Sequence, residues 1–116
     1  MNDRLTEIRI EENRLDNKLY EIEEEQRATE RVFEEAEAHY KSALDFFNSM
    51  KEKNGGNGFE DSHSFVLKHQ YNMLDKIEEK KESLRKQHLA VQDDLDSLFY
   101  EKKRLLTDVE VKEAEI

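Results

Sequence analysis

The sequence contains no proline, no cysteine and no tryptophan, and its only three glycines are Gly55, Gly56 and Gly58. Proline removes a backbone donor and clashes with the preceding helical turn, so its absence permits helices of unusual length. Without cysteine the chain has neither a disulfide nor a thiol nucleophile. Residues 1–7 lack the apolar core of a cleaved signal peptide, and no stretch approaches the roughly 18 uncharged apolar residues of a membrane span. We therefore expect a cytoplasmic protein, with export alongside a client left open.

Charged residues outnumber apolar ones, at 41% of the chain against 35%, and the net charge is −10. Acidic and basic residues are interspersed along both halves, which is unlike the single-sign blocks of disordered tails. A net negative surface argues against nucleic acid as the main partner, because phosphate binding needs positive charge. Such a composition cannot fill a thick globular core, but it can cover a narrow apolar seam with charge, as in coiled coils.

A seven-residue apolar repeat runs through both halves of the chain. With Leu5 at heptad position a, 11 of the 14 a and d positions up to Met50 are apolar or aromatic. From Leu67 to Ile116, 10 of 15 are apolar. Apolar residues that recur about every 3.5 positions over many heptads indicate a coiled coil. The positions that interrupt the repeat are polar; they are Glu12, Gln26, Thr29, Gln70, Lys81, His88, Lys102 and Lys112.

The segment Asn54-Gly55-Gly56-Asn57-Gly58 separates the two repeats. Glycine and asparagine tolerate the left-handed conformations that end a helix and reverse the chain. The sequence therefore predicts an all-α fold: a long antiparallel two-helix hairpin, which a partner could complete to a four-helix bundle. The single domain would span residues 1–116, with helices over about 3–53 and 61–114 and a turn at 54–60. Asp61 or Ser62 would cap the second helix.

Pairing apolar residues across the hairpin gives two registers. The preferred one sets Met50 opposite Leu67, Tyr40 opposite Ile77, and Thr29 opposite His88 as a polar layer. The alternative is a slip of one heptad, which would leave Phe47 and Met50 without partners.

The apolar surface is wider than a two-helix seam requires. A stripe wider than the a and d positions normally packs against a further helix. One interpretation is that the extra side chains cover the seam edges or pair in a homodimer; the other is that they dock a different helical protein. Since two helices alone bury little area, we expect association of one kind or the other. The predicted partner-binding residues are Val32, Leu44, Phe46, Phe47, Met50, Phe65, Val66, Tyr71, Met73, Phe99 and Leu106.

No pattern of catalytic, metal-binding or cofactor-binding residues stands out. Of the four histidines, only His63 lies in a Glu-x-x-His spacing, Glu60 to His63, without the second copy that di-metal bundles use. His88 falls in the seam, and His39 and His69 are expected to face solvent or lie near the turn. The glycine-rich segment lacks the Lys-Ser/Thr ending of a phosphate loop. We predict a protein that is not an enzyme and that binds no metal or cofactor.

The length, acidic heptads and mid-chain turn resemble the small helical-hairpin proteins of the Gram-positive type VII secretion system. Those proteins have a Trp-x-Gly turn, whereas this chain has residues 54–59, Asn-Gly-Gly-Asn-Gly-Phe. Together with the late segment Leu98-Phe99-Tyr100-Glu101-Lys102-Lys103-Arg104-Leu105, this is more similar to a companion group, the small α-helical partners of LXG-type toxins. That resemblance implies a chaperone or targeting factor that binds the toxin's helical N-terminal domain and delivers it to the secretion machinery.

Two other functions fit the same pattern. One is a structural stalk or assembly protein, like the helical hairpins associated with type III secretion and flagellar ATPases. The other is a homodimeric spacer or regulator. All three are protein-binding functions without catalysis.

Overall fold

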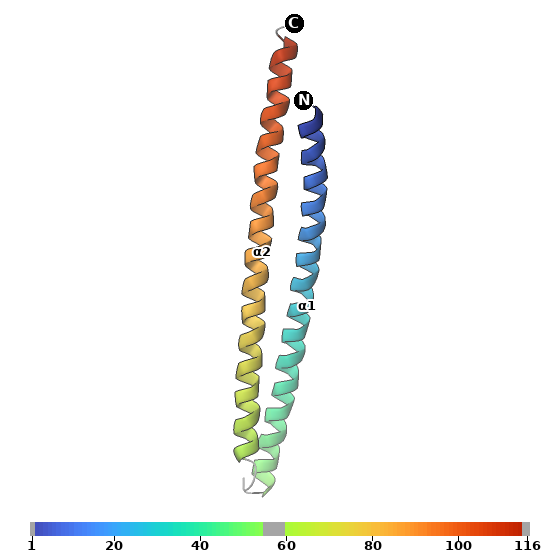
Figure 1. The fold of residues 1–116 in the computed structure, drawn as a ribbon. Helices are drawn as coiled ribbons and strands as arrows, with labels where there is room; N and C mark the ends of the chain where they lie inside the picture. Colours follow the sequence, from blue (N-terminus) through green and yellow to red (C-terminus); the bar gives the residue numbers. More distant parts are fainter. Residues whose placement is uncertain (1, 55–59, 115–116) are drawn as a thin grey trace. The chain divides into compact units, whose positions relative to one another are not determined.

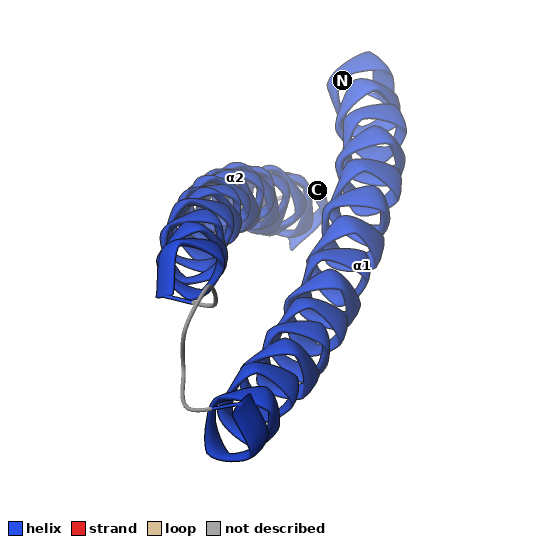
Figure 2. Cartoon of the chain, turned by 90° about the horizontal axis from the view of Figure 1, so that it is seen from below, coloured by secondary structure: helices blue, strands red, loops and turns tan. Residues whose placement is uncertain are grey.

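The computed structural model describes residues 2–54 and 60–114, and all of these residues are helical (Figures 1 and 2). Helix α1 spans Asn2–Asn54 and helix α2 spans Glu60–Ala114. The all-α class and the two-helix organisation predicted from the repeats are confirmed, and the helix bounds agree with the prediction to within one residue. The predicted glycine turn at residues 55–59 lies outside the described residues.

The start of α2 differs from the predicted cap. Because α2 begins at Glu60, Asp61 and Ser62 lie inside its first turn and neither precedes the helix. Glu60 and Asp61 still favour this end, since carboxylates are stabilised by the partial positive charge of a helix N-terminus. Lys51 and Lys53 complement the opposite charge in the last turn of α1.

The chain divides into two compact units that contain a part of each helix. Unit 1 comprises residues 1–25 and 84–116, and unit 2 comprises residues 26–83. In unit 1, Arg4 contacts Glu101 and Glu23 contacts His88, so the α1 and α2 segments run antiparallel. In unit 2 the contacts of Glu30 with Lys81 and of Tyr40 with His69 show the same direction.

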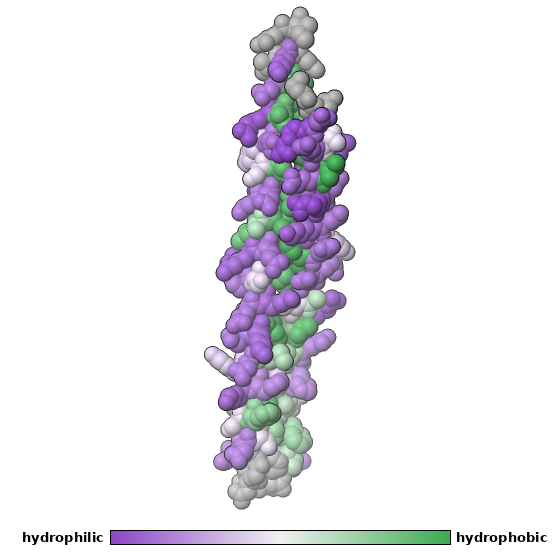
Figure 3. All heavy atoms as spheres, in the orientation of Figure 1, coloured by the Kyte–Doolittle hydropathy of each residue, from purple (hydrophilic) through white to green (hydrophobic). Residues whose placement is uncertain are grey.

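The heptad repeat defines the buried side of α1. Every a and d residue from Leu5 to Met50 is buried or half-buried. In the space-filling view, hydrophobic side chains accordingly gather along the line between the helices, with hydrophilic ones over the outer surface (Figure 3). The predicted seam of α1 is confirmed at each of its positions.

The seam of α2 follows the predicted positions from Gln70 to Val109 but departs from them near the start of the helix. There Leu67 is 43% exposed, and Val66 is half-buried in its place. Adjacent residues of an α-helix lie about 100° apart around its axis, so Val66 and Leu67 cannot both face α1. With Val66 turned towards α1, Leu67 is turned away from it.

Unit 1 contains the well-packed core. Three residues of α1 and three of α2 form one buried apolar cluster, and Leu19, Leu95 and Leu105 pack against it. Ile8 and Leu84 are the largest side chains that are almost completely buried, at 0% and 1% exposure. The members of the cluster are Ile8, Leu15, Ile22, Leu84, Val91 and Leu98.

Unit 2 is packed more thinly. Its buried apolar side chains among the described residues are Tyr40 and Ile77, and the rest of its seam is half-buried apart from the exposed Leu67. Part of this seam is built from polar contacts instead. Lys81 Nζ lies 3.1 Å from Glu30 Oε2 and 3.8 Å from the centre of the Phe33 ring. The hydrogen bond to Glu30 raises the pKa of Lys81.

We expect the difference in packing to appear in amide hydrogen exchange. Local opening is easier where few apolar contacts hold a segment. Amides of α1 in unit 2, between residues 30 and 50, should therefore exchange faster than those between residues 8 and 22 in unit 1. Exchange followed by mass spectrometry on the isolated chain measures both segments in one experiment. Equal protection of the two segments would contradict the assignment of the stronger core to unit 1.

The register differs from the preferred prediction. His88 lies beside Glu23 at 3.3 Å, not beside Thr29, and Tyr40 lies beside His69, not beside Ile77. Each partner is thus six to eight residues from its predicted place, which is close to one heptad. Consistent with this slip, the last turns of α2 lie beyond the start of α1 (Figure 1).

The polar seam residues explain the slip. Counting apolar pairs alone favours the other register, but the observed one gives four of the interrupting side chains charged partners. Lys102 lies 3.5 Å from Glu12, Lys81 pairs with Glu30, and His88 faces Glu23. Half-buried polar groups without partners are costly, so these contacts select the register. The slipped register was expected to leave Phe47 and Met50 without partners, and for Phe47 this was wrong. The centre of the Phe47 ring lies 5.8 Å from that of His63. Met50 is half-buried.

A bidentate ion pair between Arg4 and Glu101 connects α1 and α2 in unit 1. Arg4 donates from Nε to Glu101 Oε1 at 2.6 Å and from Nη2 to Glu101 Oε2 at 2.7 Å. Paired hydrogen bonds of this kind fix geometry as well as charge. They lower the pKa of Glu101.

This ion pair predicts a pH dependence. A carboxyl group whose pKa is lower in the folded state stabilises the fold above its unfolded pKa, and this contribution disappears as the pH falls through the folded pKa. Acidification from pH 7 should therefore destabilise the parent chain more than Glu101→Gln, which has no carboxylate to protonate. Circular dichroism melts at a series of pH values provide the comparison. If the melting temperatures of the two proteins change in parallel with pH, the ion pair contributes nothing to the stability of the fold in solution.

Candidate protein-binding surface

The predicted partner-binding residues fall into two groups. Seven are exposed, and these can reach a partner without rearrangement. The other four, Leu44, Phe47, Met50 and Val66, are half-buried. Phe47 is half-buried because its ring packs against that of His63 of α2. Its side chain therefore contributes to the contact between the two helices and is only partly available to a partner. The exposed seven are Val32, Phe46, Phe65, Tyr71, Met73, Phe99 and Leu106.

Several exposed apolar residues were not predicted. Ile10, Tyr20 and Leu89 are 64%, 62% and 46% exposed, and Leu67 was assigned to the seam. The prediction was based on the heptad positions beside the seam. It missed Ile10, Tyr20 and Leu89 because these residues occupy the outer positions b and f. An apolar residue on the outer face of an otherwise charged helix was the available signal.

Exposed large apolar side chains outnumber buried ones. Among the side chains that the structure describes, twelve large apolar or aromatic ones are exposed and eight hydrophobic ones are buried. Single exposed apolar residues are ordinary on soluble proteins, but a contiguous apolar patch marks an interaction site. The arrangement of these residues therefore decides whether they form a site.

In unit 2, one edge of the helix pair carries more apolar residues than the other and is almost free of acidic residues. Residues at heptad positions c and g of both helices line this edge, which we call the apolar edge. Of its thirteen residues only Glu35 is acidic, although 29 of the 116 residues of the chain are acidic. The apolar edge comprises Ala28, Val32, Glu35, His39, Ser42, Phe46 and Ser49 of α1 and Val66, His69, Met73, Lys76, Lys80 and Ser83 of α2.

The opposite edge of unit 2, at heptad positions b and e, has another character. Six of its twelve residues between 27–49 and 68–82 are acidic: Glu30, Glu34, Glu37, Asp75, Glu78 and Glu82. We call it the acidic edge. The two edges of unit 2 therefore present different chemistry to a partner.

A groove crosses the apolar edge. It has a volume of about 300 Å³ and is lined by Ala28, Thr29 and Val32 of α1 and by Lys76, Ile77 and Lys80 of α2. Ile77 is buried, whereas Val32 is 51% exposed. The groove is thus apolar, with two lysine side chains as its charged groups. It is of a size to accept apolar side chains from a partner.

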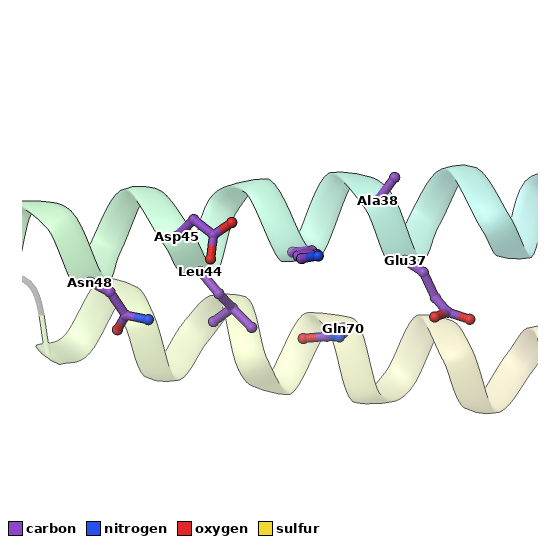
Figure 4. Close-up of a pocket in the computed structure, with 7 residues that line it drawn as sticks. Glu37, Ala38, Leu44, Asp45, Asn48 and Gln70 are labelled. Atoms are coloured by element: carbon purple, nitrogen blue, oxygen red, sulfur yellow. The ribbon is translucent and has the colours of Figure 1, made fainter.

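A larger depression on the other side of unit 2 is lined mainly by polar residues. Its volume is about 540 Å³, and Leu44 and Ala38 are the only apolar residues among those that line it (Figure 4). Glu37, Lys41, Asp45, Asn48 and Gln70 supply the rest. A partner bound there would have to desolvate the two carboxylates and the ammonium group, so this depression is a weaker docking site than the groove.

Histidines and aromatic rings are concentrated in unit 2. The Tyr40 hydroxyl lies 2.6 Å from His69 Nδ1, and the Phe65 ring stacks on that of His69 with centres 6.4 Å apart. The Phe46 ring meets that of Phe47 edge to face at 5.9 Å. These contacts order the exposed aromatic rings before a partner arrives, which lowers the entropy lost on binding.

Neither a metal site nor a membrane-spanning helix is present among the described residues. No cluster of three or more histidine, aspartate or glutamate residues within 2–54 and 60–114 has an arrangement that could hold a metal ion. In the same residues, neither helix contains a segment long and apolar enough to cross a bilayer. The exposed apolar residues of unit 2 are therefore the strongest candidate for a functional surface in this part of the chain.

Comparison with protein-family models, with curated proteins and with solved structures finds no match to this chain.

Proposed function

We propose that this protein is a non-catalytic helical adaptor or chaperone that binds the helical N-terminal domain of a secreted LXG-type toxin and targets it to a type VII secretion system. The observation that carries the binding role is the excess of exposed over buried large apolar side chains, twelve against eight in the described part of the chain. The resemblance of the hairpin to the small partners of LXG toxins supplies the identity of the client.

The thin packing of unit 2 supports a binding role. Its seam has only Tyr40 and Ile77 as buried apolar residues within the described chain, yet Val32, Phe46 and Met73 stay exposed at its edge. A client helix laid against this edge would bury these side chains and add the apolar contacts that unit 2 lacks. Burial stabilises by about 25 cal/mol per Å² of apolar surface, so binding and folding of unit 2 would reinforce each other.

The polar contacts inside the seam fit the same role. Glu12 with Lys102 and Glu23 with His88 specify one register of the hairpin. Polar seam positions reduce stability but discriminate among partners. An adaptor that must release its client gains more from a specific contact than from a maximally stable one.

The direct test is binding to a toxin domain. The purified chain is mixed with the N-terminal helical domain of an LXG toxin encoded beside its gene, and the mixture is analysed by sedimentation velocity and thermal melting. We expect a defined complex and a higher melting temperature for the chain. A stable, highly helical homodimer that ignores the toxin domain would instead establish a spacer or stalk, and would contradict the adaptor function.

A further inference from the structure

We infer that the apolar edge of unit 2 binds one amphipathic helix of the client, and that acidic residues flank the apolar row of that helix. This inference deepens the proposed function and rests on it. Its basis is the groove at Ala28, Val32 and Ile77, together with the lysines that border it.

The shape of the surface favours a helix over a small ligand. The groove is open and small, at about 300 Å³, which is the lower limit of typical small-molecule pockets. Exposed apolar residues extend away from it along the same edge, at Val32 and Phe46 of α1 and Met73 of α2. Val32 and Phe46 are two heptads apart, or about 21 Å along a helix. An occupant that contacts both must be extended, and a helix presents an apolar row of that length.

The charge of the surface defines the chemistry of the flanks. Lys76 and Lys80 are the charged residues of the groove, and Glu35 is the only acid on the apolar edge. A client helix lying on Ile77 and Val32 would bring its flanking residues beside these two ammonium groups. Acidic flanks would be attracted there and lysine flanks repelled. The local preference is opposite to that expected from the net charge of −10.

A second copy of this chain is a poorer occupant. Two copies would each bring a net charge of −10 to the interface. The acidic edge of unit 2 has the charge to face Lys76 and Lys80, but Tyr71 is its only exposed large apolar residue. It therefore offers no continuous apolar row for the groove.

Two designed peptides test the flanking charge directly. Each has about 28 residues, long enough for appreciable helicity, and leucine at positions a and d. One carries glutamate at e and g and the other lysine, so like charges oppose self-association of either peptide. With fluorescein-labelled peptides and the full chain, we expect the glutamate peptide to bind about fivefold tighter by fluorescence anisotropy. Tighter binding of the lysine peptide, or no binding of either, would overturn the inference.

Substitutions in the full chain locate the site. The double change Lys76→Glu with Lys80→Glu should reverse the peptide preference, and Ala28→Phe should weaken both peptides by filling the groove. Lys68→Glu with Lys86→Glu adds the same charge to exposed positions of α2 outside the apolar edge, and should keep the preference. Circular dichroism of each variant confirms that the helices are retained. An unchanged preference in the Lys76/Lys80 variant would place the binding elsewhere and refute the site.

The toxin domain separates this inference from the proposed function. If the domain binds and the Lys76/Lys80 variant binds it equally well, the adaptor function stands and the site is wrong. If the designed peptides behave as expected but the toxin domain does not bind, the site stands and the proposed client is wrong. If the Lys76/Lys80 change alone dissociates a dimer in sedimentation experiments, a second copy occupies the edge and the inference is wrong.

Discussion

Replacing Leu84 with alanine should remove most of the helical signal of this protein at temperatures where the parent chain is folded. Leu84 is 1% exposed and belongs to the buried cluster of unit 1. Leucine-to-alanine changes in packed cores cost about 2–5 kcal/mol, through lost burial and the cavity left behind. Small domains have little stability in reserve, so a loss of this size can unfold the molecule.

The chain contains a matched control for this experiment. Leu89 lies on the same helix, in the same unit, and is 46% exposed. Leu89→Ala removes the same atoms from a surface position and should change the melting temperature little. Thermal and urea unfolding followed by circular dichroism compare the two variants with the parent. If Leu89→Ala and Leu84→Ala destabilise the chain equally, the core of unit 1 is not where the structure places it.

Replacing Phe46 with aspartate should weaken binding of the toxin domain by about tenfold or more while leaving the hairpin helical. Phe46 is 58% exposed, so its loss removes little of the seam. Aromatic residues at the centre of an interface commonly contribute about 2 kcal/mol or more, and burial of the new carboxylate adds a further penalty. Isothermal titration calorimetry against the toxin domain measures the change.

The structure also decides how this experiment should be designed. Phe46 and Phe47 are both predicted partner-binding residues, but changing both to aspartate would confuse binding with folding, because Phe47 packs against His63. The single change at Phe46 avoids this. Asn48→Asp introduces a carboxylate at an exposed position of the acidic edge, two residues away, and serves as the control for added charge. Retained affinity in Phe46→Asp would exclude Phe46 from the interface.

The sequence predicted the helices and most of the seam. The absence of proline and the unbroken heptads of residues 5–50 were sufficient for α1, because a buried stripe on a helix follows directly from the spacing of its apolar residues. The prediction failed locally at Leu67, which is exposed while its neighbour Val66 is half-buried in its place. The candidate surface was predicted in part: Val32, Phe46 and Met73 were identified, whereas Ile10, Tyr20 and Leu89 lie at outer positions that the search did not include.

What the amino-acid sequence alone determined is therefore local: two long helices, the side of each that is buried, and an excess of apolar residues beyond the seam. Only the tertiary structure decided the register, since Glu23, Glu30 and Glu12 find their partners His88, Lys81 and Lys102 across the helix pair. It also decided that Val32, Ile77 and Lys80 line a common groove. The physical reason is that periodicity fixes directions around one helix axis, whereas the pairing of two helices depends on contacts between residues distant in sequence.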